Sequence, residues 1–197
     1  LIEQLKQLEI TFEHIDLGGG LGINYDGEEP PARRDYIQTI VSTLNNQNLE
    51  LIIEPGRSIV GNAGVLLTKV EYLNKGKEHN FAIVDAAMND LIRPALYEGW
   101  HDIKRVVETS NAEESVYDIV GPVCETGDFL GKARQLQLEH EDVLAVCSAG
   151  AYGFTMSSNY NSRPRVAEIM VDGDQAHEIR RRETISELMN GESLLPE

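Results

Sequence analysis

A carboxylate and a guanidinium stand three residues apart at the end of an apolar run. Glu54-Pro55-Gly56-Arg57 directly follows Leu49–Ile53, whose composition predicts a buried strand. Pro55 and Gly56 would end that strand and turn the chain. Charged side chains at the carboxyl end of a strand are where α/β proteins bind their ligands. A purely structural ion pair between Glu54 and Arg57 is the alternative, and this motif alone does not exclude it.

A run of glycines follows an earlier predicted strand at Phe12–Leu17. In Gly18-Gly19-Gly20-Leu21-Gly22 the backbone N–H groups can converge on one point without hindrance from side chains, which suits a phosphate. The spacing is neither that of a dinucleotide-binding fold nor that of a P-loop. A flexible tight turn is the alternative interpretation.

A cysteine lies in a turn-rich loop between glycine and aspartate. Gly121–Asp128 places Cys124 beside Glu125, and a thiol in such a loop is more often reactive than one inside a strand. An inert loop thiol is the alternative. Cys147 falls in an apolar run and is expected to be a buried hydrophobic residue. No histidine or second cysteine stands at metal-ligand spacing from Cys124, so we expect no metal site.

Two further segments could recognise a ligand. Arg93 and Tyr97 are four residues apart, so one helical turn would place both on the same face, where they suit a carboxylate. Tyr152 is flanked by small residues and could meet a flat ligand with its ring. An exposed arginine beside a packed tyrosine, and a tyrosine that covers a strand end, are the respective alternatives. The five histidines show no clustering, and the sequence assigns them no role.

The elements that must position these residues change character along the chain. Helical spacing at Leu1–Leu8 and Tyr36–Leu44 alternates with the two strands named above, which predicts parallel strands joined by helices. After Gly61 short apolar runs separated by turn residues predict an antiparallel β-sandwich or barrel. These runs are 65–73, 80–85, 104–108, 116–120, 143–148 and 166–171. A closing helix is expected at Arg181–Leu188, with Asn190-Gly191 as its stop.

The predicted domains are therefore residues 1–63 and 64–197. A complete (β/α)8 barrel needs eight strands and roughly 250 residues. With only two strands, residues 1–63 are expected to be the C-terminal piece of a larger β/α barrel, and the start at Leu1 is expected to be a fragment boundary.

Composition limits the class of partner. The 197 residues carry 17 basic and 33 acidic side chains, a net charge of −16, which argues against nucleic acid or an anionic membrane as the main partner. No apolar run approaches the ~20 residues of a membrane span. Two cysteines make no disulfide framework, so a reducing, cytoplasmic location is expected.

In their order along the chain, these motifs resemble the decarboxylases that use pyridoxal 5'-phosphate (PLP) and share the alanine-racemase-like fold type. The chain is most similar to the C-terminal half of members that act on meso-2,6-diaminopimelate. The segments that carry the resemblance are Asp16–Gly22, Glu54–Arg57, Arg93–Tyr97, Gly121–Glu125, Ser148–Tyr152, Asn161–Arg165 and Arg181–Glu183.

The resemblance implies a role for each motif. Gly18 to Gly20 would hold the cofactor phosphate, and Glu54 would face the pyridine nitrogen. Arg57 would serve the phosphate, the substrate carboxylate or both. The cofactor-binding set would comprise Gly18, Gly19, Gly20, Glu54, Pro55, Gly56, Arg57 and Tyr152.

For the substrate, the resemblance implies that Arg93 and Tyr97 bind the carboxylate at the far, L-configured end. Glu125 would bind the far amino group, and Tyr152 would contact both substrate and cofactor. Cys124 would be the acid that returns a proton after CO2 leaves. In this family the cysteine loop reaches the active site of the other subunit, so a homodimer is implied.

The lysine that attaches the cofactor, and the histidine that stacks on its ring, lie upstream of this sequence in the family. The 197 residues alone are therefore expected to be inactive. Three alternatives stay open: a sister decarboxylase acting on ornithine, arginine or carboxynorspermidine, a non-catalytic regulatory relative, and an unrelated acidic binding module.

Overall fold

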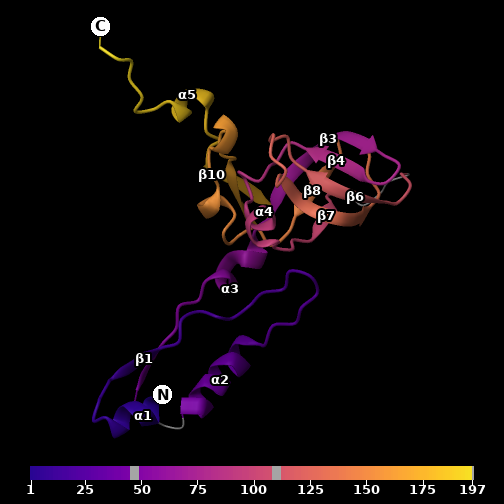
Figure 1. Ribbon diagram of the computed structural model, residues 1–197. Helices are drawn as coiled ribbons and strands as arrows, with labels where there is room; N and C mark the ends of the chain where they lie inside the picture. The colour runs from indigo at the N-terminus through magenta and orange to yellow at the C-terminus, as the bar shows by residue number, and fades with distance from the viewer. Residues whose placement is uncertain (45–48, 108–111, 197) are drawn as a thin grey trace.

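The computed structural model describes residues 1–44, 49–107 and 112–196. It has an elongated outline in which a small helical part at the N-terminus stands apart from a β-sheet domain (Figure 1). Two short helical segments, α3 (Arg57–Val60) and η1 (Gly61–Ala63), connect these two parts. The C-terminal hairpin and tail extend from the side of the sheet domain.

The N-terminal part has the predicted order of helix, strand, helix and strand. Its elements are α1 (Ile2–Gln7), β1 (His14–Asp16), α2 (Arg33–Leu44) and β2 (Glu50–Ile52). The two strands pair in parallel, with His14 opposite Glu50 and Asp16 opposite Ile52, as the intervening helix requires. The prediction that β2 is buried is wrong, because among the described residues β1 is its only neighbouring strand, and Ile52 and Ile53 both stay 37% exposed.

Six strands form the sheet of the second part, in the order β5-β8-β3-β4-β6-β7. They are β3 (Leu66–Lys75), β4 (Asn80–Val84), β5 (Ile103–Arg105), β6 (Ser115–Val120), β7 (Phe129–Leu136) and β8 (Val143–Val146). The edge strands β5 and β7 approach each other, since a Cβ on Gly131 would lie 2.9 Å from Ile103 Cδ1. The sheet thus curls into a nearly closed barrel, as predicted.

The expectation that all neighbouring strands are antiparallel is wrong for one pair. β4 and β6 run in parallel, with Phe81 opposite Asp118. The long connection between them contains α4 (Arg93–Tyr97) and β5, so the chain has room to return to the same end of the sheet before β6 starts. The sheet is therefore mixed.

The core lies inside this curled sheet. Its largest fully buried side chains include Tyr117, Leu91, Ile119, Leu130 and Leu144. They come from β6, β7, β8 and the segment before α4, and they pack together in one hydrophobic cluster. The predicted strand 104–108 is shorter than expected, because β5 ends at Arg105, and Glu108 lies outside the described residues.

A hairpin and a short helix end the described chain. The hairpin pairs β9 (Glu168–Asp172) with β10 (Gln175–Arg180), and α5 spans Ile185–Leu188. The closing helix was expected to start at Arg181, which is wrong. Thr184 caps the helix through a capping box with Glu187, so residues before Thr184 stay outside it.

No helix in the described part of the chain is long and apolar enough to cross a membrane.

Candidate active site

The glycine-rich segment and the Glu54 motif lie against each other at the carboxyl ends of β1 and β2. Glu54 N–H donates to the carbonyl of Gly18 at 2.7 Å, and Gly18 N–H donates to the Asp16 carboxylate at 2.8 Å. A Cβ at Gly19 would lie only 2.5 Å from the carbonyl oxygen of Glu54. Only glycine therefore lets the two loops approach this closely.

This glycine loop presents backbone donors. Gly18 and Gly20 have φ angles of +67° and +88°, which side-chain-bearing residues rarely adopt. The Tyr36 hydroxyl donates to the Gly19 carbonyl at 2.6 Å and braces the loop from α2. Within the described residues, the N–H groups of Gly19 and Gly20 have no acceptor. They are available to an anion such as a phosphate.

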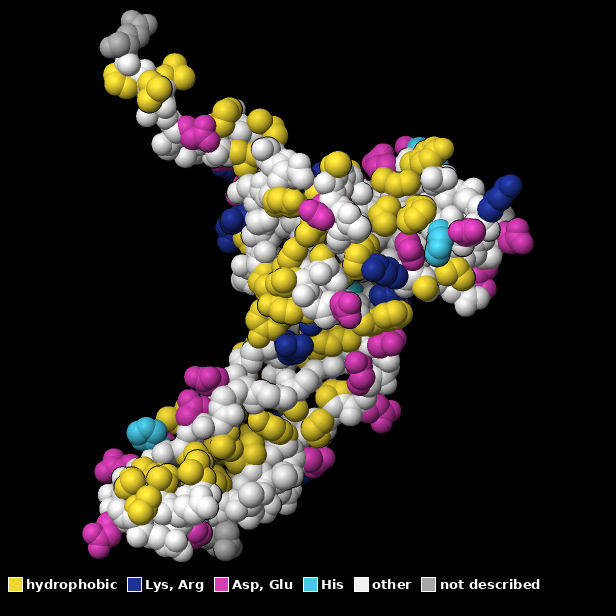
Figure 2. Space-filling view, in the orientation of Figure 1, with side chains coloured by type: hydrophobic (Ala, Val, Ile, Leu, Met, Phe, Trp, Pro, Cys, Tyr) yellow, Lys and Arg dark blue, Asp and Glu magenta, His cyan; other side chains and the backbone are white. Residues whose placement is uncertain are grey.

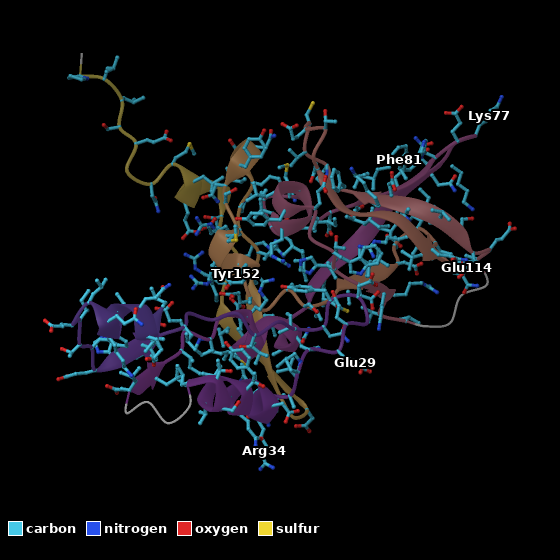
Figure 3. All side chains as sticks on the ribbon, turned by 60° about the horizontal axis from the view of Figure 1, so that its bottom comes forward. Glu29, Arg34, Lys77, Phe81, Glu114 and Tyr152 are labelled. Carbon is cyan, nitrogen blue, oxygen red and sulfur yellow. The ribbon has the colours of Figure 1, made fainter. Side chains whose placement is uncertain are left out.

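Arg57 lies between two tyrosine rings. Its guanidinium carbon is 5.8 Å from the ring centre of Tyr25 and 5.5 Å from that of Tyr152. Its Nη1 also donates to the Tyr25 hydroxyl at 3.5 Å. Tyr152 lies close to the Glu54 motif, because a Cβ on Gly56 would be 2.7 Å from the Tyr152 hydroxyl. Figure 3 shows Tyr152 where the N-terminal part meets the sheet domain.

Arg93 approaches the same tyrosine, Tyr25, from α4. Its guanidinium carbon lies 4.6 Å from the centre of the Tyr25 ring, and the residue is only 8% exposed. Tyr152, Arg57, Tyr25 and Arg93 thus form a continuous series of contacts, called here the arginine–tyrosine stack. Four segments that are distant in sequence contribute to it.

His101 completes the surroundings of Arg93. Its Nε2 is 2.9 Å from Arg93 Nη1, and its Nδ1 is 2.8 Å from the Cys147 carbonyl oxygen. Because a carbonyl only accepts, Nδ1 carries the proton and Nε2 accepts from Arg93. Burial lowers the pKa of His101, and the charge of Arg93 lowers it further, against the hydrogen bond to Cys147. The imidazole is therefore neutral.

Among the described residues, the two arginines of the stack have no acidic partner. In the part of the chain that the structure describes, neither Arg57 nor Arg93 forms an ion pair. The structural ion pair between Glu54 and Arg57, considered above as the alternative, is thus not found there. Two unpaired guanidiniums in a chain of net charge −16 mark a site for an anionic ligand.

The remaining predicted residues lie on the surface. α4 confirms the helical spacing of Arg93 and Tyr97, but Tyr97 is 62% exposed whereas Arg93 is buried. Cys124 is exposed, and the Glu125 carboxylate accepts a hydrogen bond from the Tyr160 hydroxyl at 3.3 Å. None of the described contacts joins Cys124 or Glu125 to the arginine–tyrosine stack.

A buried carboxylate fixes the loop that carries Cys124. Asp128 accepts N–H bonds from Met88 and Val123, both at 2.7 Å. Burial raises the pKa of Asp128, while the two backbone hydrogen bonds oppose that rise. Asp128 therefore ties the cysteine loop to the segment that precedes α4. Cys147, expected to be buried, is half-buried, and burial raises the pKa of its thiol.

Two residues of this site were missed from the sequence. Tyr25 lies in a polar loop without a recognisable pattern, and His101 was assigned no role. Tyr25 and His101 matter because they contact Arg57 and Arg93. Both arginines are distant from Tyr25 in sequence, and the end of α4 separates Arg93 from His101. A local motif carries no signal for such contacts.

The fold and the site define a class of protein. Residues 16–150 match the family model described as pyridoxal-dependent decarboxylase, C-terminal sheet domain, and the chain belongs to this family. The mixed, nearly closed sheet is the domain for which the family model is named.

Individual relatives narrow the comparison. The chain is 61% identical over 197 residues to a diaminopimelate decarboxylase of Pseudomonas fluorescens, covering 100% of this chain and 47% of the relative. The structure resembles that of a Helicobacter pylori diaminopimelate decarboxylase complexed with L-lysine, with a TM-score of 0.85 and 42% identity, covering 95% of this chain and 46% of the other. A second L-lysine complex, from M. jannaschii, matches with a TM-score of 0.86 and 37% identity over 98% of this chain and 46% of the other.

The chain thus spans about half the length of the curated relatives that it matches.

Proposed function

We propose that this chain is the C-terminal half of a PLP-dependent decarboxylase that converts meso-2,6-diaminopimelate to L-lysine and CO2, the last step of bacterial lysine biosynthesis. The observation that carries the proposal is a pair of guanidiniums, Arg57 and Arg93, that both lie close to the Tyr25 ring and form no ion pair within the described residues. Diaminopimelate has a carboxylate at each end, and two cationic groups in one site suit such a ligand. The relatives' names point to the same substrate.

The residues present fit PLP. The N–H groups of Gly19 and Gly20, without acceptors in the described residues, would hold its phosphate beside Arg57. Glu54, at the end of β2, would keep the pyridine nitrogen protonated through its carboxylate. Tyr152 would contact the cofactor and the substrate. When bound, PLP supplies the electron sink that receives the electron pair released as CO2 leaves.

At the far end of the substrate, Arg93 and Tyr97 would bind the L-configured carboxylate, and Glu125 would bind the amino group. Burial supports this role for Arg93, because a guanidinium removed from water and lacking a carboxylate partner gains most from a ligand that provides one. The charge of Glu125 is opposite to that of an ammonium, and Tyr160 orients its carboxylate.

Cys124 would be the acid that returns a proton to the substrate carbon. Its loop is exposed, and Asp128 anchors it away from the contacts of the stack. We therefore propose that the loop serves the site of a second subunit in a homodimer. Each active site would then combine the stack of one protomer with Cys124 and Glu125 of its partner.

We further propose that residues 1–63 complete a β/α barrel together with chain that precedes them, and that residues 64–197 are the β domain. Figure 2 shows apolar side chains over much of one face of the N-terminal part. Leu1, Leu8 and Val41 of this part are all exposed. Its two-stranded sheet leaves Ile52 and Ile53 partly exposed. Additional strands and helices of a barrel would bury this surface. Two free cysteines fit a reducing compartment, and we propose the cytoplasm.

The test is CO2 release by the longer enzyme that contains this chain. We expect turnover of meso-diaminopimelate, little or none of ornithine or arginine, and no turnover by the 197 residues alone. An absorbance band of the bound cofactor that borohydride abolishes would distinguish an enzyme from a non-catalytic relative. Preferential turnover of ornithine or arginine would replace the proposal with a sister activity.

A matched pair of arginine variants tests the site itself. Arg93→Met should reduce kcat/KM for diaminopimelate by about tenfold to a hundredfold, the effect of losing about 1.5–3 kcal/mol in a hydrogen bond to a charged group. Arg34→Met, on the exposed surface of α2, should leave kcat/KM unchanged. Equal effects of the two substitutions would refute the assignment of Arg93.

A further inference from the structure

Arg93 is a buried cation whose described protein contacts are all with neutral groups. It is 8% exposed, it lies 4.6 Å from the Tyr25 ring centre, and it bonds to His101 at 2.9 Å. The Tyr25 and His101 rings meet edge to face, with centres 5.4 Å apart and an angle of 79° between their planes. Tyr25 and His101 thus form two adjoining walls around one guanidinium.

Because Tyr25 and His101 are neutral, they leave the charge of Arg93 and most of its N–H groups available, which an acidic partner would not. A carboxylate beside Arg93 would neutralise its charge and would compete with an anionic ligand for its N–H groups. The tyrosine ring attracts the cation through its π face without occupying any N–H group. His101 accepts a single hydrogen bond, and a guanidinium has five N–H donors. The remaining donors and the full positive charge stay available to a ligand.

The histidine is itself fixed by the backbone. The Cys147 carbonyl accepts from Nδ1 at 2.8 Å, so Nε2 must present its lone pair to Arg93. The groups that surround this imidazole are Arg93 from α4, Arg134 from β7, Tyr25 from the N-terminal part and the carbonyl of Cys147 after β8. None of these described groups is a carboxylate. A proton on Nε2 would abolish the acceptor and place two cations 2.9 Å apart.

We propose that Tyr25 and His101 are positioning residues that hold the Arg93 guanidinium correctly aimed without offsetting its charge, and that they thereby set the preference for substrates with a carboxylate at the non-reacting end. This inference rests on the proposed function and extends it to two residues without an assigned role. They act through Arg93 and need not touch the substrate.

Two probes separate recognition of the carboxylate from general binding. L-Lysine and cadaverine are both chains with two amino groups, but only L-lysine has a carboxylate. In the longer enzyme with its cofactor, each compound is used as an inhibitor of CO2 release from diaminopimelate. His101→Leu removes both hydrogen bonds, whereas His101→Gln can accept from Arg93 and donate to Cys147. His140→Leu, on the surface, is the matched control.

The expected result is selective. His101→Leu should weaken inhibition by L-lysine about tenfold to a hundredfold, the range seen when a group that orients a binding residue is lost. Inhibition by cadaverine should change less than twofold, and KM for diaminopimelate should rise more than kcat falls. His101→Gln should restore most of the L-lysine affinity, and His140→Leu should match the wild type. Tyr25→Leu should behave like His101→Leu, whereas Tyr25→Phe, which keeps the ring against Arg93 and loses only the hydroxyl that accepts from Arg57, should keep most of the L-lysine affinity.

Other outcomes separate this inference from the proposed function. If the wild-type enzyme releases no CO2 from diaminopimelate, the proposed function fails. If the wild type is active but His101→Leu weakens both inhibitors equally, or neither, the positioning role is refuted. Cofactor content and melting temperature of each variant exclude a failure to fold, and His101→Gln keeps the test decisive if His101→Leu is unstable.

Discussion

Replacing Gly19 by alanine tests whether the close approach of the two strand-end loops builds the cofactor site. The added Cβ would lie 2.5 Å from the Glu54 carbonyl oxygen, which is backbone and cannot rotate away. Close C···O contacts in proteins are about 3.3 Å, so the loops must separate by roughly 0.8 Å. That shift would disturb the 2.7 Å bond between Glu54 N–H and the Gly18 carbonyl. It would also displace the N–H donors of Gly19 and Gly20 from the position proposed for the cofactor phosphate.

A displacement of this size has a predictable cost. Misplacing a binding group by 1 Å can cost about a hundredfold, so we expect PLP affinity to fall about tenfold to a hundredfold, or about 1.4–2.7 kcal/mol. The assay is titration of the longer apoenzyme with PLP, followed by absorbance. Gly22→Ala is the matched control in the same loop, because a Cβ there has no heavy atom within 4 Å. The reasoning fails if Gly19→Ala binds PLP as the wild type does, or if Gly22→Ala loses as much affinity.

Three further predictions concern the scaffold of the site, and each is measured by urea denaturation of the longer enzyme. Leu144→Ala, in the fully buried core, should lower the free energy of unfolding by about 2–5 kcal/mol, and no loss would contradict the assigned core. Asp128→Asn should cost about 1–3 kcal/mol, because the Met88 and Val123 N–H groups bond to different oxygens of the carboxylate and an amide replaces one of these oxygens with an NH2 donor; an unchanged midpoint would refute this account of the loop. The third concerns His101, whose pKa is lower in the folded than in the unfolded state. As the pH falls, His101 takes up a proton in the unfolded chain before it does so in the folded chain. The contribution of neutral His101 to the free energy of unfolding is therefore full above pH ~6.5 and declines as the pH falls toward the pKa of His101 in the folded state. The wild type should therefore lose stability relative to His101→Gln over that window, and parallel pH profiles would show that His101 is not buried as described.

The fold was predictable from the sequence where hydrophobic periodicity is regular. The N-terminal alternation of helices and strands was confirmed, and so was the change to a β domain. β7 was missed because Gly131 and Lys132 interrupt its apolar pattern and Ala133 has a φ angle of +51°. The parallel pairing of β4 with β6 was also missed, since strand direction depends on where the intervening chain crosses the sheet and not on the composition of either strand.

The sequence by itself determined which chemical groups are available and in what order. The glycine run at Gly18–Gly20 and the Glu54–Arg57 motif can be read from the sequence, because residues that are adjacent in sequence at the end of a strand necessarily lie close together in space. Only the tertiary structure decided that Arg57 and Arg93 both lie close to the Tyr25 ring and that Arg93 bonds to His101. Such contacts form when the sheet domain packs against the N-terminal loops, so no spacing along the chain encodes them. The environment that leaves both guanidiniums without an acidic partner among the described residues is a property of the folded protein.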